Sequence, residues 1–124
     1  MKDFKKNNIL VAVVDDDVYV CEAVESLLKS IGFRTATFNS ARDFLDSPEF
    51  SNVSCVILDV SMPVMNGLEL QRHLAASHPM PIIFITARNG DTREQALRAG
   101  AISFLTKPFS DASLIDALHS ALGA

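Results

Sequence analysis

The chain has 124 residues, of which 48% are hydrophobic and 21% are charged, and this composition is typical of a globular protein. Its length is that of one ordinary domain with a buried core, so we expect residues 1–124 to form a single domain. The formal net charge of −4 argues against direct binding of nucleic acid, which requires a basic face. The first apolar run ends after six residues at three aspartates, which argues against a signal peptide or a membrane span, and we expect a cytoplasmic protein.

The first part of the chain predicts two strand–helix pairs. The continuous apolar run Ile9–Val14 predicts a buried strand, and Val18–Ser30 carries apolar residues at helical spacing. Arg34–Phe38 alternates in the manner of an edge strand. Ser40 then opens a short helix in the style of a capping box, and Pro48 marks its end.

The second part of the chain predicts three further strand–helix pairs, with strands again read from short apolar runs and helices from their capping residues. They are a strand at Cys55–Leu58, a helix that follows a turn bracketed by Pro63 and Gly67 and runs to about Ser77, a strand at Ile82–Thr86, a helix capped by Asp91-Thr92-Arg93-Glu94 and ended by Gly100, a strand at about Ser103–Thr106, and a helix capped by Ser110-Asp111.

Five alternating strand–helix units with short loops predict an α/β protein with a parallel sheet layered between helices. We expect the flavodoxin-like (βα)5 fold, a doubly wound parallel sheet with strand order 2-1-3-4-5. The fourth helix has little apolar content beyond Ala96, Leu97 and Ala99, so burial anchors it weakly and we expect it to be the most movable element.

Four of the predicted strands end on polar residues, which the parallel arrangement brings to one edge of the sheet. The first strand runs into Asp15-Asp16-Asp17 and the third into Asp59, while the fourth ends at Thr86 and the fifth is followed by Lys107. Neighbouring carboxylates repel one another unless a cation lies between them, and Mg²⁺ prefers such oxygen ligands. The sequence therefore predicts a site for Mg²⁺ and a phosphoryl group.

Each of these residues also has an ordinary structural interpretation. Asp17 is explained by the dipole of the helix that follows, and Thr86 and Lys107 are individually common at strand ends. An ionised Asp59 at the end of a buried strand is costly without a partner, and its chemical role would be that of a carboxylate nucleophile. A hydroxyl and an ammonium nearby would then contact phosphoryl oxygens.

Four motifs follow the strands, namely Asp15-Asp16, Asp59-Val60-Ser61-Met62-Pro63-Val64-Met65-Asn66-Gly67, Thr86-Ala87 and Lys107-Pro108-Phe109. In combination they resemble the receiver domain of bacterial two-component response regulators. The resemblance extends from about Ile9 to Leu122 and is greatest to receivers of the nitrogen-fixation and nitrate regulator type, which usually precede a helix-turn-helix DNA-binding domain. The chain departs from the family pattern at Asn66, where Asp is common, and at Phe104, where Tyr is common.

The resemblance implies a phosphoacceptor and a metal site. Asp59 would accept a phosphoryl group from the phosphohistidine of a sensor histidine kinase. Asp16, Asp59 and the backbone carbonyl of Ser61 would bind Mg²⁺ directly, and Asp15 would act through water. The protein would then not be an enzyme in the ordinary sense, although it would assist its own phosphorylation and dephosphorylation.

The resemblance also implies a switch. Lys107 would contact the phosphoryl group, and the peptide bond that follows it is expected to be cis. Thr86 and Phe104 would form the switch pair, with Phe104 rotating inward, and Ser61 and Arg88 would flank the path of the water that hydrolyses the acyl phosphate. Phosphorylation would remake the surface of the fourth helix, fifth strand and fifth helix, and would favour a homodimer or the docking of an output domain that regulates transcription.

Three other functions remain open. A phosphatase of the haloacid dehalogenase type also uses Asp, Mg²⁺, Thr and Lys, but it requires an acid two residues after the nucleophile, where this chain has Ser61. A flavin carrier would need a phosphate-binding loop rich in Ser, Thr and Gly after the first strand, which is absent from the sequence. A degenerate receiver that acts only as a docking module would not need all five site positions.

Overall fold

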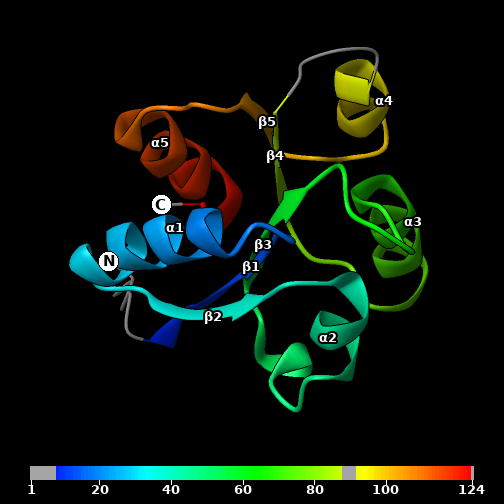
Figure 1. Cartoon of the computed structure of the whole chain (residues 1–124), viewed down its shortest axis with the longest axis horizontal. Helices are drawn as coiled ribbons and strands as arrows, with labels where there is room; N and C mark the ends of the chain where they lie inside the picture. The colour runs from blue at the N-terminus through cyan, green and yellow to red at the C-terminus, as the bar shows by residue number, and fades with distance from the viewer. Residues whose placement is uncertain (1–7, 88–91, 124) are drawn as a thin grey trace.

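The computed structural model describes residues 8–87 and 92–123, and five strands in this part of the chain form one parallel sheet (Figure 1). The strand order β2-β1-β3-β4-β5 confirms the predicted flavodoxin-like topology. The elements in chain order are β1 (Leu10–Val14), α1 (Val18–Ser30), β2 (Arg34–Phe38), α2 (Ala41–Asp46), β3 (Cys55–Asp59), α3 (Gly67–Ser77), β4 (Ile82–Thr86), α4 (Thr92–Arg98), β5 (Ser103–Thr106) and α5 (Asp111–Leu122).

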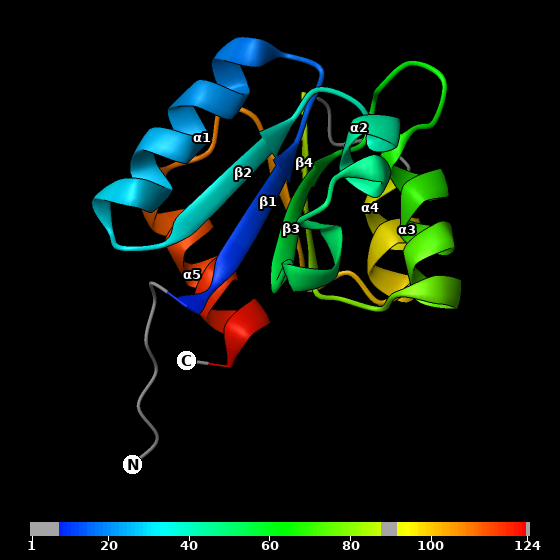
Figure 2. The same ribbon diagram turned by 90° about the horizontal axis from the view of Figure 1, so that it is seen from below.

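The helices lie in two layers, one on each face of the sheet. Helices α1 and α5 cover one face, while α2, α3 and α4 lie on the other, as Figure 2 shows. All residues of β1, β3 and β4 are buried, because these central strands have helices on both faces. Successive side chains of β1 point to opposite faces, so that Val11 and Val13 pack in the α1–α5 layer and Ala12 and Val14 in the other.

The predicted helix starts are confirmed where the caps are described. Ser40 accepts a hydrogen bond from the Asp43 N–H at the start of α2. Asn66 and Glu69 form a reciprocal capping box at the start of α3, so the amide that replaces the common Asp has a structural role there. Ser110 caps α5 by accepting a hydrogen bond from the Ser113 N–H. These caps set where each loop at the carboxyl edge of the sheet ends.

Some predicted boundaries differ from the structure. β1 begins at Leu10 rather than Ile9, and β3 continues to Asp59, so the acid is the last strand residue and not the first loop residue. A 3₁₀ turn at Phe50–Asn52 was not predicted, because three residues are too few to show a periodic pattern.

Helix α4 is short, and Ala96 is its single buried residue. This agrees with its predicted weak anchoring. The expected cap at Asp91 lies outside the described residues. Among the described helices, none is both long enough and apolar enough to cross a bilayer.

Candidate functional site

The carboxyl ends of the central strands bring the predicted site residues together. Carboxylate oxygens of Asp15, Asp16 and Asp59 all lie within 4.8 Å of one another. The ammonium of Lys107 follows β5 and lies 2.9 Å from Asp15 Oδ2 and 4.0 Å from Asp59 Oδ1. Thr86 ends β4, which lies between β3, the strand that ends at Asp59, and β5, the strand that precedes Lys107. The structure therefore assembles three carboxylates, a cation and a hydroxyl at one edge of the sheet.

The Asp15 side chain is fully buried and both of its oxygens have partners. Its Oδ1 accepts the backbone N–H of Asp17 at 2.8 Å, and its Oδ2 accepts from Lys107. The neighbouring Asp16 is exposed. Of these two acids, Asp16 is thus the one that has its side chain open to solvent and to a cation.

Asp17 has a third and separate role, as the N-cap of α1. Its Oδ1 accepts the backbone N–H groups of Tyr19 at 2.9 Å and Val20 at 3.4 Å. From the sequence, Asp17 is explained by the dipole of this helix, and the structure adds that its side chain caps the first turn. The sequence run of three aspartates therefore contains one buried ion-pair partner, one exposed carboxylate and one helix cap.

Asp59 is 4% exposed, and its Oδ1 accepts the backbone N–H of Ser61 at 3.3 Å. Burial raises the pKa of Asp59 to about 7, and the Asp15 carboxylate adds to the rise, while Lys107 and the Ser61 N–H act in the opposite direction. Burial lowers the pKa of Lys107, but the hydrogen bond to Asp15 and the charges of Asp59 and Asp15 outweigh it, so that its pKa is raised overall. The site thus stores unfavourable negative charge that a second cation would neutralise.

Gly67 is a site residue whose role the sequence analysis missed. It lies against the end of β3, and its N–H donates to the carbonyl of Val60 at 2.8 Å. A Cβ at this position would overlap the carbonyl oxygen of Asp59 and approach the Phe84 ring to 3.0 Å. The spacing of this glycine from Asp59 was visible in the sequence, but the close approach of the two backbones was not.

The predicted switch residues lie on the neighbouring strands β4 and β5, where Thr86 is opposite Thr106 and Phe104 is opposite Phe84. Thr86 is 3% exposed and Phe104 is 4% exposed, and the Phe104 ring centroid lies 6.1 Å from that of Phe84. Phe104 thus takes the inward position that the predicted switch requires, packed in the core layer that contains Phe84. The peptide bond between Lys107 and Pro108 is cis, as expected. The predicted role of Arg88 falls on a residue outside the described part of the chain.

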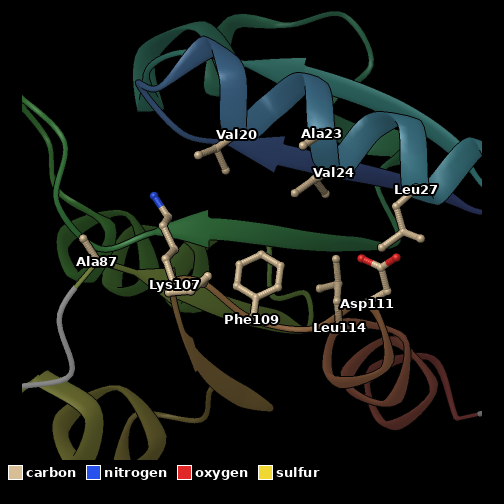
Figure 3. A pocket seen from close by; sticks show the side chains of 10 residues that line it. Val20, Ala23, Val24, Leu27, Ala87, Lys107, Phe109, Asp111 and Leu114 are labelled. Carbon is tan, nitrogen blue, oxygen red and sulfur yellow. The ribbon is translucent and has the colours of Figure 1, made fainter.

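A cavity of about 430 Å³ between α1 and α5 opens next to the site (Figure 3). Its walls are mainly apolar, with Val20, Ala23 and Leu27 on α1 facing Phe109 on the other side. Lys107 lines the end of this cavity near the start of α1, and it is also the ion-pair partner of Asp15, so the cavity and the candidate site share this residue.

Two other contacts near the site were not predicted. The side-chain amide of Asn39, which directly follows β2, donates to the backbone carbonyl of Asp15 at 3.1 Å. The guanidinium of Arg93 on α4 donates to the backbone carbonyl of Phe104 at 3.1 Å. One sequence signal for Asn39 was available. Like Asp15 after β1, Asn39 is a polar residue directly after a strand, and that strand, β2, neighbours β1. No sequence signal linked Arg93 to Phe104.

Comparison with known proteins identifies relatives of this chain. A family profile of the response regulator receiver domain matches residues 11–119. The response regulator protein TmoT of Ectopseudomonas mendocina is 46% identical over 116 residues, which are 91% of this chain and 52% of the relative. The transcriptional regulatory protein FixJ of Bradyrhizobium diazoefficiens is 37% identical over 113 residues, 89% of this chain and 55% of the relative. The chain thus spans about half the length of the curated relatives it matches.

Solved structures of response regulator receivers are also similar to this chain. A response regulator receiver protein from Burkholderia phymatum is 45% identical with a TM-score of 0.81, covering 93% of this chain and 95% of that structure. A structure titled FixJ-N is 31% identical with a TM-score of 0.83, covering 99% of this chain and 96% of that one. Profile, relatives and fold agree with the geometry of the site, and we conclude that this chain belongs to the receiver domains of two-component response regulators.

Proposed function

We propose that this chain is a cytoplasmic phosphorelay receiver in which Asp59 accepts a phosphoryl group from the phosphohistidine of a sensor histidine kinase. The observation that carries the proposal is the convergence of Asp59 with Lys107 and the two acids of the β1 end within one cluster. An oxygen of the Asp59 carboxylate would form a bond to phosphorus while the P–N bond of the donor breaks, and the donor imidazole would keep the electron pair and take up a proton.

The side chains around Asp59 suit this transfer. The ammonium of Lys107, 4.0 Å from Asp59, would neutralise charge on the phosphoryl oxygens, and the Thr86 hydroxyl would donate a hydrogen bond to one of them. Burial of Asp59 keeps the acyl phosphate in a low-dielectric environment where these contacts are strong.

The acidic cluster fits Mg²⁺, because its donors are the carboxylate oxygens that this ion prefers. Asp16, Asp59 and the Ser61 carbonyl would hold the ion directly, and Asp15 would act through water since its own oxygens are committed to Lys107 and Asp17. When bound, the ion supplies positive charge to the phosphoryl oxygens and offsets the repulsion among the carboxylates.

The cavity between α1 and α5 is the proposed contact surface for the kinase, because it is mainly apolar and continuous with the site through Lys107 (Figure 3). Ala23→Arg should block transfer from a kinase that phosphorylates the wild-type chain, while labelling by acetyl phosphate stays unchanged. Loss of both reactions, or of neither, would contradict this placement.

Labelling by acetyl phosphate tests the phosphoacceptor. With Mg²⁺ present, the wild-type chain should gain one phosphoryl group by mass spectrometry, and Asp59→Asn should gain none. Asp116→Asn, an exposed acid on α5, is the matched control and should label like wild type. Equal labelling of Asp59→Asn and wild type would overturn the assignment of Asp59.

The alternative functions have separate readouts. Multiple turnover of p-nitrophenyl phosphate would instead support a phosphatase of the haloacid dehalogenase type. A chain that binds no beryllofluoride would be a degenerate receiver. Ser61 and Arg88 are the proposed determinants of phosphoryl lifetime, so exchanging either should change the rate of dephosphorylation and leave labelling intact.

The proposed output is a remade surface of α4, β5 and α5 that favours a homodimer or docks an output domain or partner protein. Several relatives bear names of transcriptional regulators, FixJ and TdiR among them, which supports an output in transcription. Size-exclusion chromatography with and without beryllofluoride tests the dimer, which should form only with the phosphoryl mimic.

A further inference from the structure

The end of the β1–β2 ladder carries an unusual side-chain hydrogen bond. The paired residues run from Leu10↔Arg34 to Val14↔Phe38, and one further backbone bond joins the Asp15 N–H to the Phe38 carbonyl at 3.0 Å. In a regular parallel ladder the Asp15 carbonyl would next accept a backbone N–H of the neighbouring strand. Here the chain turns away at Ser40 to cap α2, and the side-chain amide of Asn39 donates to that carbonyl instead, at 3.1 Å.

A second side chain reaches the same carbonyl from α1. The buried thiol of Cys21 lies 3.4 Å from the Asp15 carbonyl oxygen and donates to it, and the Asn39 amide nitrogen lies 3.7 Å from the Cys21 sulfur. Asn39 therefore completes a small network in which α1 and the end of β2 both hold the peptide group that follows Asp15.

Asp15 is the residue on which the rest of the site is arranged. With Asn39, Cys21 and Phe38 on its main chain and Lys107 and Asp17 on its side chain, each of its polar groups has a partner. Turning its peptide would move the carboxylate away from Lys107 and change the distances among the three acids.

We infer that Asn39 is a positioning residue for the site, acting through the main chain of Asp15 to set the affinity for Mg²⁺. This inference rests on the proposed function, since it assumes that the acidic cluster holds Mg²⁺. The bond is partly exposed, so water can replace the amide as a donor, and the effect is on alignment rather than on folding. An outer hydrogen bond of this kind tunes metal affinity by orienting the ligands.

The test compares Asn39→Ala and Asn39→Leu with Asn52→Ala. Asn39→Leu keeps the size of the side chain without its donor, and Asn52 is an exposed asparagine in the 3₁₀ turn that precedes β3, at the opposite edge of the sheet. Mg²⁺ is titrated into each chain and followed by the amide NMR shifts of Asp16 and Asp59. The half-saturating Mg²⁺ concentration should rise about threefold to tenfold in both Asn39 variants and stay within twofold of wild type in Asn52→Ala.

A second readout needs no metal. Amide hydrogen exchange at Asp15 and Asp17 in metal-free chain should accelerate in the Asn39 variants, while exchange in the middle of β1 remains unchanged. Cys21→Ser keeps a donor toward the Asp15 carbonyl and should bind Mg²⁺ like wild type. Wild-type Mg²⁺ affinity in both Asn39 variants, or a fall in thermal midpoint with no change in Mg²⁺ affinity, would overturn the inference and leave Asn39 a purely structural residue.

Failure of this inference is distinguishable from failure of the proposed function. If wild type neither binds Mg²⁺ nor labels with acetyl phosphate, the proposed function itself is wrong. If wild type does both and the Asn39 variants match it, only the positioning role is lost.

Discussion

Arg93 of α4 is bound to Phe104 of β5 through both polar and aromatic contacts. Its guanidinium donates to the Phe104 carbonyl at 3.1 Å, and its central carbon lies 5.8 Å from the centroid of the Phe104 ring. Because Ala96 is the single buried residue of α4, contacts made by polar side chains matter more for this helix than for its neighbours. A second polar side chain that contacts α4 comes from α3, where the buried Gln71 donates a hydrogen bond to the Ala96 carbonyl at 3.0 Å.

Arg93→Met is therefore expected to loosen α4. The variant keeps an apolar stem but loses the hydrogen bond and the cation–π contact, so amide exchange in α4 should accelerate about threefold to tenfold. Labelling of Asp59 by acetyl phosphate should not change. Arg98→Met is the matched control, because Arg98 pairs with Glu94 within the same exposed helical face. Equal exchange in the two variants would mean that Arg93 does not hold α4.

Gly67→Ala tests the close approach of α3 to the phosphoacceptor strand. The added Cβ would overlap the Asp59 carbonyl, so we expect a loss of about 1–3 kcal/mol in the free energy of unfolding and slower labelling by acetyl phosphate. Gly100→Ala is a useful comparison, since that residue has φ of +107° but open space around its Cβ position. It should lower stability through backbone strain alone and leave the labelling rate unchanged, and urea unfolding with mass spectrometry measures both quantities. Wild-type labelling by Gly67→Ala would contradict the proposed contact.

The raised pKa of Asp59 predicts a specific pH dependence of stability in metal-free chain. The folded state holds a proton on Asp59 up to a pKa of about 7, whereas the unfolded chain releases it near the ordinary value of 3.8. The free energy of unfolding should therefore fall as pH rises from about 4 to about 7, by up to about 4 kcal/mol.

The amide variant isolates this contribution. Asp59→Asn cannot titrate, so its urea midpoint should lose most of that slope and lie above the wild-type midpoint at pH 7.5. Asp116→Asn, which changes an exposed acid on α5, should retain the wild-type slope. Addition of Mg²⁺ should stabilise wild type most at neutral pH, where the carboxylates are charged. An unchanged slope in Asp59→Asn would assign the pH dependence to other groups.

Thr86 is predicted to couple the phosphoryl group to the α4–β5–α5 surface. Thr86→Val preserves the shape of a buried side chain but removes its hydroxyl, whereas Thr86→Ser retains the hydroxyl. With beryllofluoride bound, wild type and Thr86→Ser should show NMR shift changes in α4 and β5, and Thr86→Val should show much smaller ones. The mimic should bind all three chains. Shift changes of equal size in Thr86→Val and wild type would exclude the hydroxyl as the coupling group.

The sequence predicted those parts of the structure that depend on local pattern. Continuous apolar runs located the strands, and their polar endings located Asp15, Asp59 and Lys107, because parallel strands all end at one edge. The separate roles of Asp15, Asp16 and Asp17 could not be predicted from the sequence in the same way. Only the fold shows that Asp15 is fully buried against Lys107 while Asp16 faces solvent.

Contacts between distant segments could not be predicted from one sequence. Asn39 meets the carbonyl of Asp15 across 24 positions, and Arg93 meets that of Phe104 across 11. Each acceptor is a backbone carbonyl, which every residue possesses. The residue type at the accepting position therefore does not indicate that the contact exists. The burial of Phe104 belongs to the same class, since an apolar residue in a short strand is compatible with either position of the ring.

Tyr19, whose backbone N–H donates to the helix-capping Asp17, is the only tyrosine in a chain that has no tryptophan. The residue is 81% exposed and lies in the first turn of α1, three positions after Asp16. Under excitation that the eight phenylalanines do not absorb, the intrinsic ultraviolet emission of this protein therefore originates from a single phenol. The unlabelled chain thus contains its own optical probe, and the arrival of a cation or a phosphoryl group can be timed by stopped-flow fluorescence without a dye.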